Sequence, residues 1–414
     1  MKIAFLTLGC KLNYAETSTY ERVFLGAGLE AASWREKADI YLVNTCSVTA
    51  TADSKSRNLV RKVHRMNPDA LILVTGCSAQ LRRDEIEKIE GVTRVFGASE
   101  KSLVVPWTLR KLGLSYGELP ERQEIFPAFS TGERTRSFLK VQDGCNNYCR
   151  YCTVPYARGE SRNVPVCECV RNAELIAAEG VKEIVLTGVN TGDFGRTTGE
   201  SFLELLKALN GVEGIERYRI SSIEPNLITE EIIDWIASGT KFQPHFHIPL
   251  QTGCDELLKA MGRHYDTAFF KDRMDYIRRA MEAPGKPLVF FGIDVMVGLP
   301  GETDERFEVT RSFISEIRPA FVHVFPYSRR PGTPAATMPG QVPEDVKTAR
   351  VASLEELCRE LHSEFIEKNR GVREKVLFES ANRSGMMEGY TGNYIRVERP
   401  YDRTLVNTLV DVVI

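Results

Sequence analysis

The sequence lacks long apolar runs, an excess charge of either sign and low-complexity tracts. Its longest apolar stretch, Leu288 to Pro300, is too short to span a bilayer and carries Asp294. The 54 Lys and Arg residues nearly balance the 56 Asp and Glu residues, so the formal net charge is −2. With no global field, the chain can meet nucleic acid or an anionic surface only through local patches. These absences exclude a membrane-spanning protein and a generally basic one.

The composition is that of a folded chain. Of the 414 residues, 43% are hydrophobic, which is too many for a disordered protein. At roughly 100 to 200 residues per domain, the length predicts about three domains. The apolar start, Met1 to Gly9, carries one Lys and no small-residue cleavage site, so it indicates a buried strand rather than a signal peptide. We expect a soluble, cytoplasmic protein with no membrane partner.

Cysteine is abundant, with ten residues in the chain. In a reducing compartment, cysteines are seldom disulfides and more often ligands, nucleophiles or buried apolar residues. One trio forms a tight run: Cys145, Cys149 and Cys152. A second trio is widely spaced: Cys10, Cys46 and Cys77. The other four are expected to be ordinary thiols or packing residues: Cys167, Cys169, Cys254 and Cys358.

The first hundred residues alternate short apolar runs with helical periods. This rhythm predicts a doubly wound parallel α/β sheet. Each cysteine of the spaced trio directly follows a predicted strand, and the carboxyl ends of parallel strands meet at one edge. Cys10, Cys46 and Cys77 are therefore expected to converge on a metal site. The alternative, three small buried residues at strand ends, stays open at this point.

Composition and periodicity divide the rest of the chain. Residues 1–97 form the predicted N-terminal domain, and 98–136 read as a linker with poor periodicity. Residues 137–370 hold six strand and helix units, too few for a closed eight-unit barrel, which predicts a partial (β/α)6 barrel with its site at the strand carboxyl ends. Residues 371–414 show short β-like runs separated by turn residues, as in a small all-β barrel.

The segment GCNNYCRYC spaces the tight trio as C-x3-C-x2-C. Three thiolates in one loop can hold three irons of a cube-like 4Fe-4S cluster and leave the fourth iron open to a ligand. A structural zinc site would require a fourth ligand, and disulfide pairing would leave an odd thiol. The spacing therefore favours an iron-sulfur cluster.

At these residues the sequence resembles the radical S-adenosylmethionine (SAM) superfamily, whose motif is C-x3-C-x-aromatic-C, with Tyr151 as the aromatic. The resemblance implies that the open iron binds the amino and carboxylate groups of SAM. Electron transfer from the cluster then yields a 5′-deoxyadenosyl radical. A reductant protein such as flavodoxin or ferredoxin and a cluster-assembly machinery are the implied partners.

Together with the spaced trio, the chain is similar to the radical SAM methylthiotransferase family. Matching stretches include GCKLN, NTCSVT, CRYCTVPYARGESR, HIPLQTGCD, DVMVGLPGET and YSRRPGT. The resemblance implies that Cys10, Cys46 and Cys77 hold a second 4Fe-4S cluster involved in sulfur supply, and that a second SAM donates the methyl group. It also implies that 371–414, with GYTGNYIRV, is the small RNA-binding barrel called TRAM.

The substrate expected from this resemblance is a tRNA anticodon stem-loop. GCKLN with RISSIEP is most similar to the branch that adds a methylthio group to C2 of N6-threonylcarbamoyladenosine at position 37 of tRNA. Sister branches act on N6-isopentenyladenosine 37 or on a ribosomal-protein aspartate. A cobalamin-dependent radical SAM methylase is a further alternative, although no D-x-H-x-x-G element is present. The last alternative is a non-catalytic iron-sulfur protein that carries electrons or binds RNA.

Candidate SAM contacts are polar or glycine residues near predicted strand ends, together with Tyr151. They are Gly188, Asn190, Ser222, Glu224, Gln251, Arg263 and Gly298. Gly188 and Asn190, in TGVN, replace the Gly-Gly-Glu element of the superfamily. Arg263 can pair bidentately with the SAM carboxylate, and Gly298 can let the backbone approach the adenine. Turn formation, helix capping and a solvated arginine are the competing explanations.

Candidate RNA contacts are local basic and aromatic groups, which could neutralise phosphates or stack on bases. They are Arg57, Arg61, Lys62, Arg65, Arg158, Arg162, Arg329, Arg330, Tyr390 and Tyr394. The first four share one predicted helix, where a plain solvated face is the alternative. His245 and His247, two apart on one strand face, are expected to pack inside the barrel.

Overall fold

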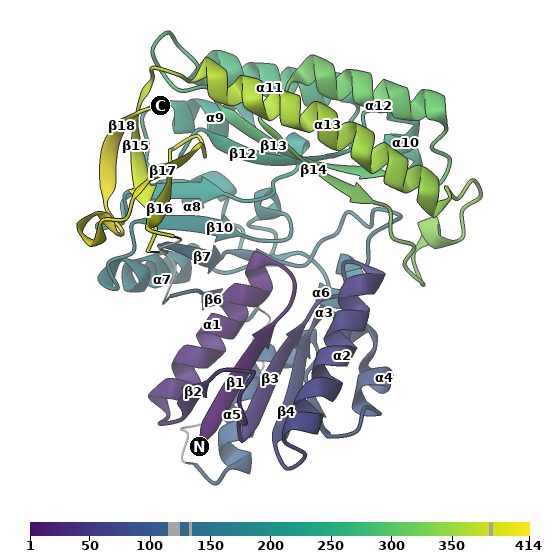
Figure 1. Cartoon of the computed structure of the whole chain (residues 1–414), viewed down its shortest axis with the longest axis vertical. Helices are drawn as coiled ribbons and strands as arrows, with labels where there is room; N and C mark the ends of the chain where they lie inside the picture. The colour runs from purple at the N-terminus through teal and green to yellow at the C-terminus, as the bar shows by residue number, and fades with distance from the viewer. Residues whose placement is uncertain (115–124, 132–134, 381–383) are drawn as a thin grey trace.

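The computed structural model describes residues 1–114, 125–131, 135–380 and 384–414. Figure 1 shows the N-terminal domain, purple to blue, below the green and teal barrel, with the yellow C-terminal sheet at the side of the barrel. None of the helices within these ranges is both long enough and apolar enough to cross a membrane.

The N-terminal sheet has five parallel strands in the order β2-β1-β3-β4-β5. They are β1 (Lys2–Thr7), β2 (Glu30–Ala32), β3 (Ile40–Thr45), β4 (Leu71–Gly76) and β5 (Val92–Val95). Every residue of β3, the central strand, is buried, as expected for a strand covered on both faces. The predicted doubly wound sheet is confirmed.

Helices cover both faces of this sheet. One face packs against α1 (Lys11–Gly26) and α5 (Val104–Lys111), through residues such as Phe24 and Leu109. The other packs against α2 (Ala50–Met66) and α4 (Arg83–Glu87), while α3 (Cys77–Leu81) follows β4 directly.

The segment expected as a linker, 98–136, is partly built into the domains on either side. The short 3-10 helix η1 (Ala98–Leu103) and α5 complete the N-terminal core, because Val104 and Leu109 are apolar and fully buried there. Strand β6 (Ala128–Phe129) pairs antiparallel with the first barrel strand. Residues 115–124 and 132–134 lie outside the described residues.

The barrel domain has six parallel strands in two sheets. They are β7 (Arg136–Lys140), β10 (Glu183–Thr187), β11 (Arg217–Ile220), β12 (His245–Gln251), β13 (Phe290–Val297) and β14 (Phe321–Pro326). The first three are ordered β11-β10-β7 and the last three β12-β13-β14. The amide of Ile223 donates to the carbonyl of His247 at 3.1 Å, so the two sheets meet at β11 and β12. The predicted partial (β/α)6 barrel is confirmed.

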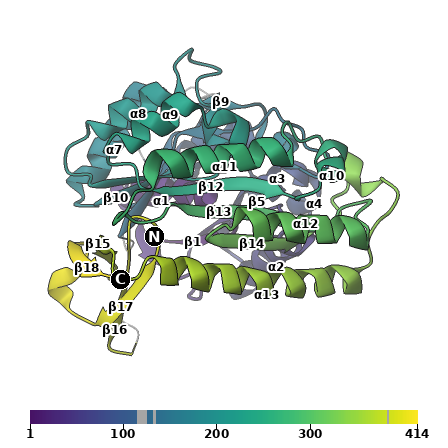
Figure 2. The ribbon, with the colours of Figure 1, turned by 90° about the horizontal axis from the view of Figure 1, so that it is seen from above.

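Helices form the outer layer of the barrel. Figure 2 shows α11, α12 and α13 alongside β12, β13 and β14. The outer helices are α7 (Val166–Ala178), α8 (Phe202–Asn210), α9 (Glu230–Ala237), α11 (Thr267–Met281), α12 (Asp304–Ile317) and α13 (Glu344–Lys368). Shorter pieces are β8 (Gln142–Asp143), α6 (Val154–Arg158), β9 (Arg162–Asn163), η2 (Thr191–Asp193), η3 (Pro225–Leu227), α10 (Asp255–Ala260) and η4 (Pro334–Ala336).

The C-terminal unit is all-β, as predicted, and in the described residues it is an open antiparallel sheet of order β17-β16-β15-β18 rather than a closed barrel. Its elements are β15 (Arg373–Phe378), β16 (Met386–Tyr390), β17 (Arg396–Pro400), η5 (Arg403–Leu405) and β18 (Leu409–Val413). Arg219 of β11 donates to the carbonyls of Thr391 at 2.8 Å and Gly392 at 2.7 Å. A buried barrel arginine therefore fixes the position of this sheet.

A cluster of buried charges joins the N-terminal domain to the barrel. Glu16 Oε1 of α1 lies 2.7 Å from Lys101 Nζ and 2.8 Å from Lys140 Nζ. Asp143 Oδ1 lies 2.9 Å from Arg158 Nη1, which also lies 3.4 Å from Glu16. The five side chains, the interdomain ion cluster, are almost inaccessible to solvent. Ion pairs in such surroundings are screened little, so they hold the two domains in a fixed relation.

Candidate functional site

The spaced cysteine trio lies at the carboxyl edge of the N-terminal sheet. Cys10 is the N-cap of α1, Cys46 directly follows β3, and Cys77 opens α3 after β4. Gly9 and Gly76 precede two of these cysteines with φ of +107° and +99°, a backbone conformation that favours glycine. A Cβ built on Gly9 would lie 3.1 Å from Cys46 Sγ, so the first two cysteine segments are in contact. The three cysteines lie at one edge of the sheet, and their binding of a shared metal stays a prediction.

The surroundings of this trio suit a cluster better than free thiolates. Burial raises the pKa of Cys46 to about 11, and it raises that of Cys77 as well. Neighbouring thiolates act in the same direction, whereas Arg158 opposes it. Iron bound at this edge would favour the thiolate form of these cysteines, because its positive charge opposes the effect of burial.

The tight cysteine trio lies in the loop between β8 and α6. The amide of Cys145 donates to the carbonyl of Gly159 at 3.1 Å, and that of Cys152 to Cys149 at 2.9 Å. A Cβ on Gly144, whose φ is +74°, would lie 1.9 Å from the carbonyl oxygen of Glu160, so only glycine fits at this turn. The loop is thereby held against the barrel.

The sulfur atoms of the tight trio already accept hydrogen bonds. The amide of Asn147 donates to Cys145 Sγ at 3.5 Å, and that of Val154 donates to Cys152 Sγ at 3.4 Å. Burial raises the pKa of Cys145 to about 11 and that of Cys152 to about 12. Amide donors around cysteine sulfurs are typical of iron-sulfur sites, where they tune the potential. The donor set fits a cluster.

Three of the predicted SAM residues, Tyr151, Glu224 and Arg263, meet beside Cys149. Arg263 Nη1 lies 3.1 Å from Cys149 Sγ and 3.4 Å from the hydroxyl of Tyr151, and its Nη2 pairs with Glu224. Tyr265, which the sequence did not single out, accepts from Arg263 Nη2 at 2.9 Å and donates to the carbonyl of Pro249 at 2.5 Å. The side chain of Arg263 is 3% exposed. The predicted alternative, a solvated helix-end arginine, is wrong.

Gly188 and Asn190 follow β10. The amides of Val189 and Asn190 both donate to Gln142 Oε1 at 2.9 Å, and a Cβ on Gly188 would lie 2.9 Å from that oxygen. Gly188 therefore makes room for Gln142, a residue that sequence reasoning missed. In the described part of the chain, the buried side-chain oxygen of Asn190 has no hydrogen-bond donor.

The remaining predicted SAM residues also lie at strand ends. Ser222 follows β11 and accepts from the amide of Thr191 through its carbonyl. Gln251 ends β12 at a β-bulge with φ of +71°. Gly298 follows β13 with φ of +75°, but a Cβ there would lie 2.3 Å from Cγ of Lys347. Lys347 of α13 thus fills the space that was predicted to admit adenine, and the role predicted for Gly298 is wrong.

Two of the predicted RNA contacts are buried ion-pair residues. Arg158 is 3% exposed and belongs to the interdomain ion cluster, and Arg330 is 4% exposed with its Nη2 2.7 Å from Asp53 Oδ2. Neither guanidinium can reach a phosphate, so both predictions are wrong. Their burial arises from contacts between domains.

The other basic candidates differ in exposure. On α2, Arg61, Lys62 and Arg65 are exposed, and Arg57 is half-buried. Arg162 is half-buried and donates to the carbonyls of Arg158 and Glu160. Arg329 is exposed while its Nε donates to the carbonyl of Ala336 at 2.5 Å. The exposed basic face of α2 is therefore the densest of these candidate phosphate contacts.

A cavity of about 1340 Å³ opens where the three domains meet. Cys10, Lys11 and Tyr14 line it from the N-terminal domain, and Tyr390 and Tyr394 line it from the C-terminal sheet. Its other walls are inward-facing residues of the barrel strands, among them Arg136, Phe138, Arg219, His245, His247 and His323. Tyr390 and Tyr394 thus face this barrel cavity, with ring centroids 4.9 Å apart.

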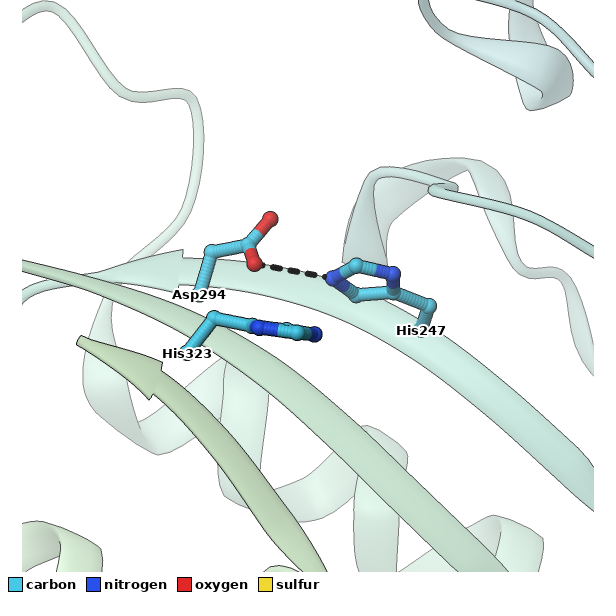
Figure 3. Close-up of side chains that lie close together, drawn as sticks. All are labelled: His247, Asp294 and His323. Carbon is cyan, nitrogen blue, oxygen red and sulfur yellow. Dashed lines mark ion pairs between the residues drawn. The ribbon is translucent and has the colours of Figure 1, made fainter. Parts of the chain in front are cut away.

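Imidazoles and one carboxylate gather on the strands behind the cavity. His247 Nε2 of β12 lies 2.9 Å from Asp294 Oδ1 of β13, and His323 of β14 stacks on His247 (Figure 3). Ligand atoms of these three residues lie within 4.8 Å of one another, and His247 Nε2 faces Asp294 Oδ1. Burial holds the pKa of His245 well below its ordinary value, so this ring is neutral at neutral pH. His245 and His247 face the barrel interior, as predicted.

Comparisons with known proteins agree with these two cysteine sites. Residues 139–314 match the radical SAM superfamily, and residues 2–97 match an uncharacterized protein family, UPF0004. The chain is 39% identical to the threonylcarbamoyladenosine tRNA methylthiotransferase MtaB of Bacillus subtilis, over 99% of this chain and 93% of that protein. Identity to MtaB of Aquifex aeolicus is 36%, over 96% and 97% of the two chains. It is 33% to the tRNA-2-methylthio-N(6)-dimethylallyladenosine synthase of Dictyoglomus thermophilum, over 95% and 91%.

Among solved structures, the fold is similar to that of the radical SAM methyltransferase TsrM of Kitasatospora setae. The TM-score is 0.59 at 14% identity, over 92% of this chain and 79% of that one. At this identity the likeness concerns the fold alone. The full-length sequence relatives, together with the two cysteine sites, show that the chain belongs to the radical SAM methylthiotransferase family.

Proposed function

We propose that this protein converts N6-threonylcarbamoyladenosine at position 37 of tRNA into its 2-methylthio derivative. The observation that carries the proposal is the cavity in which Cys10 of one cysteine site faces the barrel interior. The substrate follows from the relatives, since the Bacillus subtilis enzyme named for threonylcarbamoyladenosine is 39% identical and the Dictyoglomus enzyme named for dimethylallyladenosine 33%. The isopentenyladenosine branch is therefore the second candidate.

Cys145, Cys149 and Cys152 would hold the 4Fe-4S cluster to which SAM binds. When bound there, the cluster and SAM would supply the radical chemistry that removes hydrogen from C2 of the adenine. We assign the SAM carboxylate to Arg263, and its position beside Cys149, where Glu224 and Tyr265 bind its guanidinium, supports this role. Its burial excludes water from this end of the site.

Cys10, Cys46 and Cys77 would hold the second 4Fe-4S cluster, from which sulfur reaches the adenine. Asn13 fixes this edge, since its Nδ2 donates to the carbonyls of Leu8 at 2.8 Å and Thr45 at 3.0 Å. The interdomain ion cluster then keeps this edge facing the barrel. A second SAM molecule supplies the methyl group in this proposal.

The tRNA would present the modified base out of its stack. Unstacking costs little free energy in an anticodon loop, where the base is not held in a duplex. The TRAM-like C-terminal sheet, with Tyr390 and Tyr394 at the cavity, and the basic face of α2 are the proposed RNA contacts. A reductant protein such as flavodoxin or ferredoxin and a cluster-assembly machinery complete the partners. A tRNA substrate implies action in the cytoplasm.

Nucleoside mass spectrometry tests the substrate. Total tRNA from a strain without this gene should lose 2-methylthio-N6-threonylcarbamoyladenosine and retain the unmethylthiolated nucleoside. Unchanged levels of the methylthio product would refute the proposal. Loss of the 2-methylthio-isopentenyl nucleoside instead would assign the chain to the second candidate.

Iron content tests the two clusters. A Cys10→Ala, Cys46→Ala, Cys77→Ala triple variant should bind about half the iron of the wild type, because one of two four-iron clusters is removed. It should still release 5′-deoxyadenosine from SAM under reducing conditions. Equal iron in the two proteins would exclude the second cluster, and wild type that holds iron without releasing 5′-deoxyadenosine would favour a non-catalytic protein.

A further inference from the structure

Among the described residues that line the cavity at the junction of the three domains, Lys11 carries an ammonium that no carboxylate pairs with. Among the other lining residues, Arg136 pairs with Glu379, Arg219 with Glu183, and Arg396 with Glu388 and Glu398. Within the described residues, the ammonium of Lys11 makes no hydrogen bond and no ion pair. Lys11 directly follows Cys10, in the first turn of α1, and is exposed to the cavity.

The neighbouring charges do not compensate Lys11. Asp294, whose Oδ1 lies 2.9 Å from His247 Nε2, makes no ion pair with Lys11 within the described residues. Arg136 and Arg219, which act on Lys11, add positive potential. An ammonium without a protein partner on the wall of a concave cavity is a binding point for an incoming anion, because the anion adds a charge-assisted hydrogen bond.

The size of the cavity suits a flipped nucleoside with a substituent. Its volume of about 1340 Å³ exceeds that of an ordinary small-molecule site. Cys10 and Lys11 are adjacent on its wall, so a base that reaches the sulfur-supplying cysteines brings its N6 substituent into the same enclosure. Threonylcarbamoyl ends in a free carboxylate, whereas the isopentenyl group of the sister substrate is uncharged.

We propose that Lys11 binds the carboxylate of the N6 substituent and makes the enzyme specific for an adenosine that carries one. This inference rests on the proposed function and names the residue that recognises the N6 substituent of the substrate. Lys11 is the site's specificity-determining group, and the chemistry on C2 belongs to other residues. Removing one hydrogen-bonded charge partner weakens binding by about 10- to 100-fold.

Equilibrium binding of anticodon stem-loops tests the proposal without turnover. The probes carry N6-threonylcarbamoyladenosine at position 37, either with its carboxylate or as the neutral carboxamide, and no reductant is added. Wild type should bind the carboxylate about 10- to 100-fold more tightly than the carboxamide. Lys11→Met should bind both equally, and Lys11→Arg should keep most of the preference. Lys88→Met, on the exposed surface beyond α4, is the matched control and should behave as wild type.

Two measurements separate this role from a structural one. Iron content and the visible absorption of the clusters are measured on every variant, because a structural effect on Cys10 weakens both probes alike and lowers the iron. Should Lys11→Met lose iron, Lys11→Gln takes its place and the same comparison decides. Equal affinity of wild type for the two probes, or a Lys11 variant that still prefers the carboxylate, overturns the proposal.

A failure of the proposed function gives a different experimental result from a failure of the role of Lys11. In that case wild type, supplied with reductant and SAM, yields no 2-methylthio product from the carboxylate stem-loop, whatever its affinity. A wild type that yields the product but binds carboxylate and carboxamide equally retains the function and loses the role of Lys11.

Discussion

Arg330 Nη2, in the segment after the last barrel strand, lies 2.7 Å from Asp53 Oδ2 on helix α2 of the N-terminal domain. Asp53 also accepts from Ser78 Oγ at 2.6 Å and from Arg82 Nε at 2.8 Å. Ser78 is the neighbour of Cys77, so this carboxylate links one cysteine site to the far end of the barrel. A side chain with two cationic partners and 2% exposure stabilises docking rather than catalysis.

Asp53→Asn should destabilise the protein by about 2 kcal/mol, the usual contribution of hydrogen bonds to a charged group. Burial opposes ionisation, but the bonds from Ser78, Arg330 and Arg82 outweigh it and lower the pKa of Asp53. A carboxylate with a lowered pKa stabilises the folded state above its unfolded pKa, and the effect is lost as pH falls through the folded value. The difference should therefore be constant from about pH 5 to 7 and shrink below about pH 4.

Urea unfolding of the iron-free protein at several pH values measures this difference. Asp69→Asn, an exposed aspartate in the loop after α2, serves as the control and should change little. A gap between wild type and Asp53→Asn that widens as the pH falls would contradict the assignment.

Glu16→Gln should be more damaging, at about 3 to 5 kcal/mol, because it leaves three buried cations with Asp143 as the remaining anion of the cluster. Burial raises the pKa of Glu16, yet Lys101, Lys140 and Arg158 outweigh it and hold the pKa well below its ordinary value. Thermal unfolding reports the loss, with the exposed Glu30→Gln as control. A melting temperature unchanged from wild type would mean that the interdomain ion cluster adds nothing to stability.

Gly76→Ala should destabilise the fold by about 1 to 3 kcal/mol and lower the iron bound by the spaced cysteine trio. At φ of +99°, a Cβ would lie 2.4 Å from the carbonyl oxygen of Thr45, and Cys77 would be displaced. Gly26→Ala is the matched control, since nothing lies within 4 Å of its Cβ position. Iron analysis measures the bound iron, and chemical denaturation measures the loss of stability. A full iron content in Gly76→Ala would show that the turn does not position Cys77.

Arg263→Lys should weaken the apparent affinity for SAM by about 10- to 100-fold, because lysine keeps the charge but not the planar fork. Iron content should stay at the wild-type level. The apparent affinity constant for SAM is obtained from the rate of 5′-deoxyadenosine release measured against SAM concentration. Arg171→Lys, at an exposed position, is the control. An unchanged constant would remove Arg263 from the SAM site.

The cysteine sites could be predicted because their signals are local. Cys10, Cys46 and Cys77 each follow an apolar run, and parallel strands bring such positions to one edge. Arg263 and Glu224 were found the same way, as polar residues near strand ends. Their meeting at Cys149 required the barrel curvature, which no spacing in the sequence encodes.

The errors share a physical cause in contacts between distant segments. Arg158 and Arg330 have the charge of phosphate contacts, and only the docked domains bury them against Asp143 and Asp53. Gly298 has the backbone freedom that was predicted, but Lys347 from α13 occupies the space. Residues 98–111 have weak periodicity because α5 is short, with one apolar face against the sheet.

The interdomain ion cluster also determines which charges remain when the N-terminal domain is separated from the barrel. Glu16 and Lys101 belong to one side of the junction, whereas Lys140, Asp143 and Arg158 belong to the other. Severing the chain would leave a balanced pair on the first fragment and two cations against one anion on the second. The second fragment would then carry an unbalanced charge that Glu16 of the first one offsets in the intact chain. Chimeras that exchange N-terminal domains between relatives should assemble only when both parents carry the same five charges.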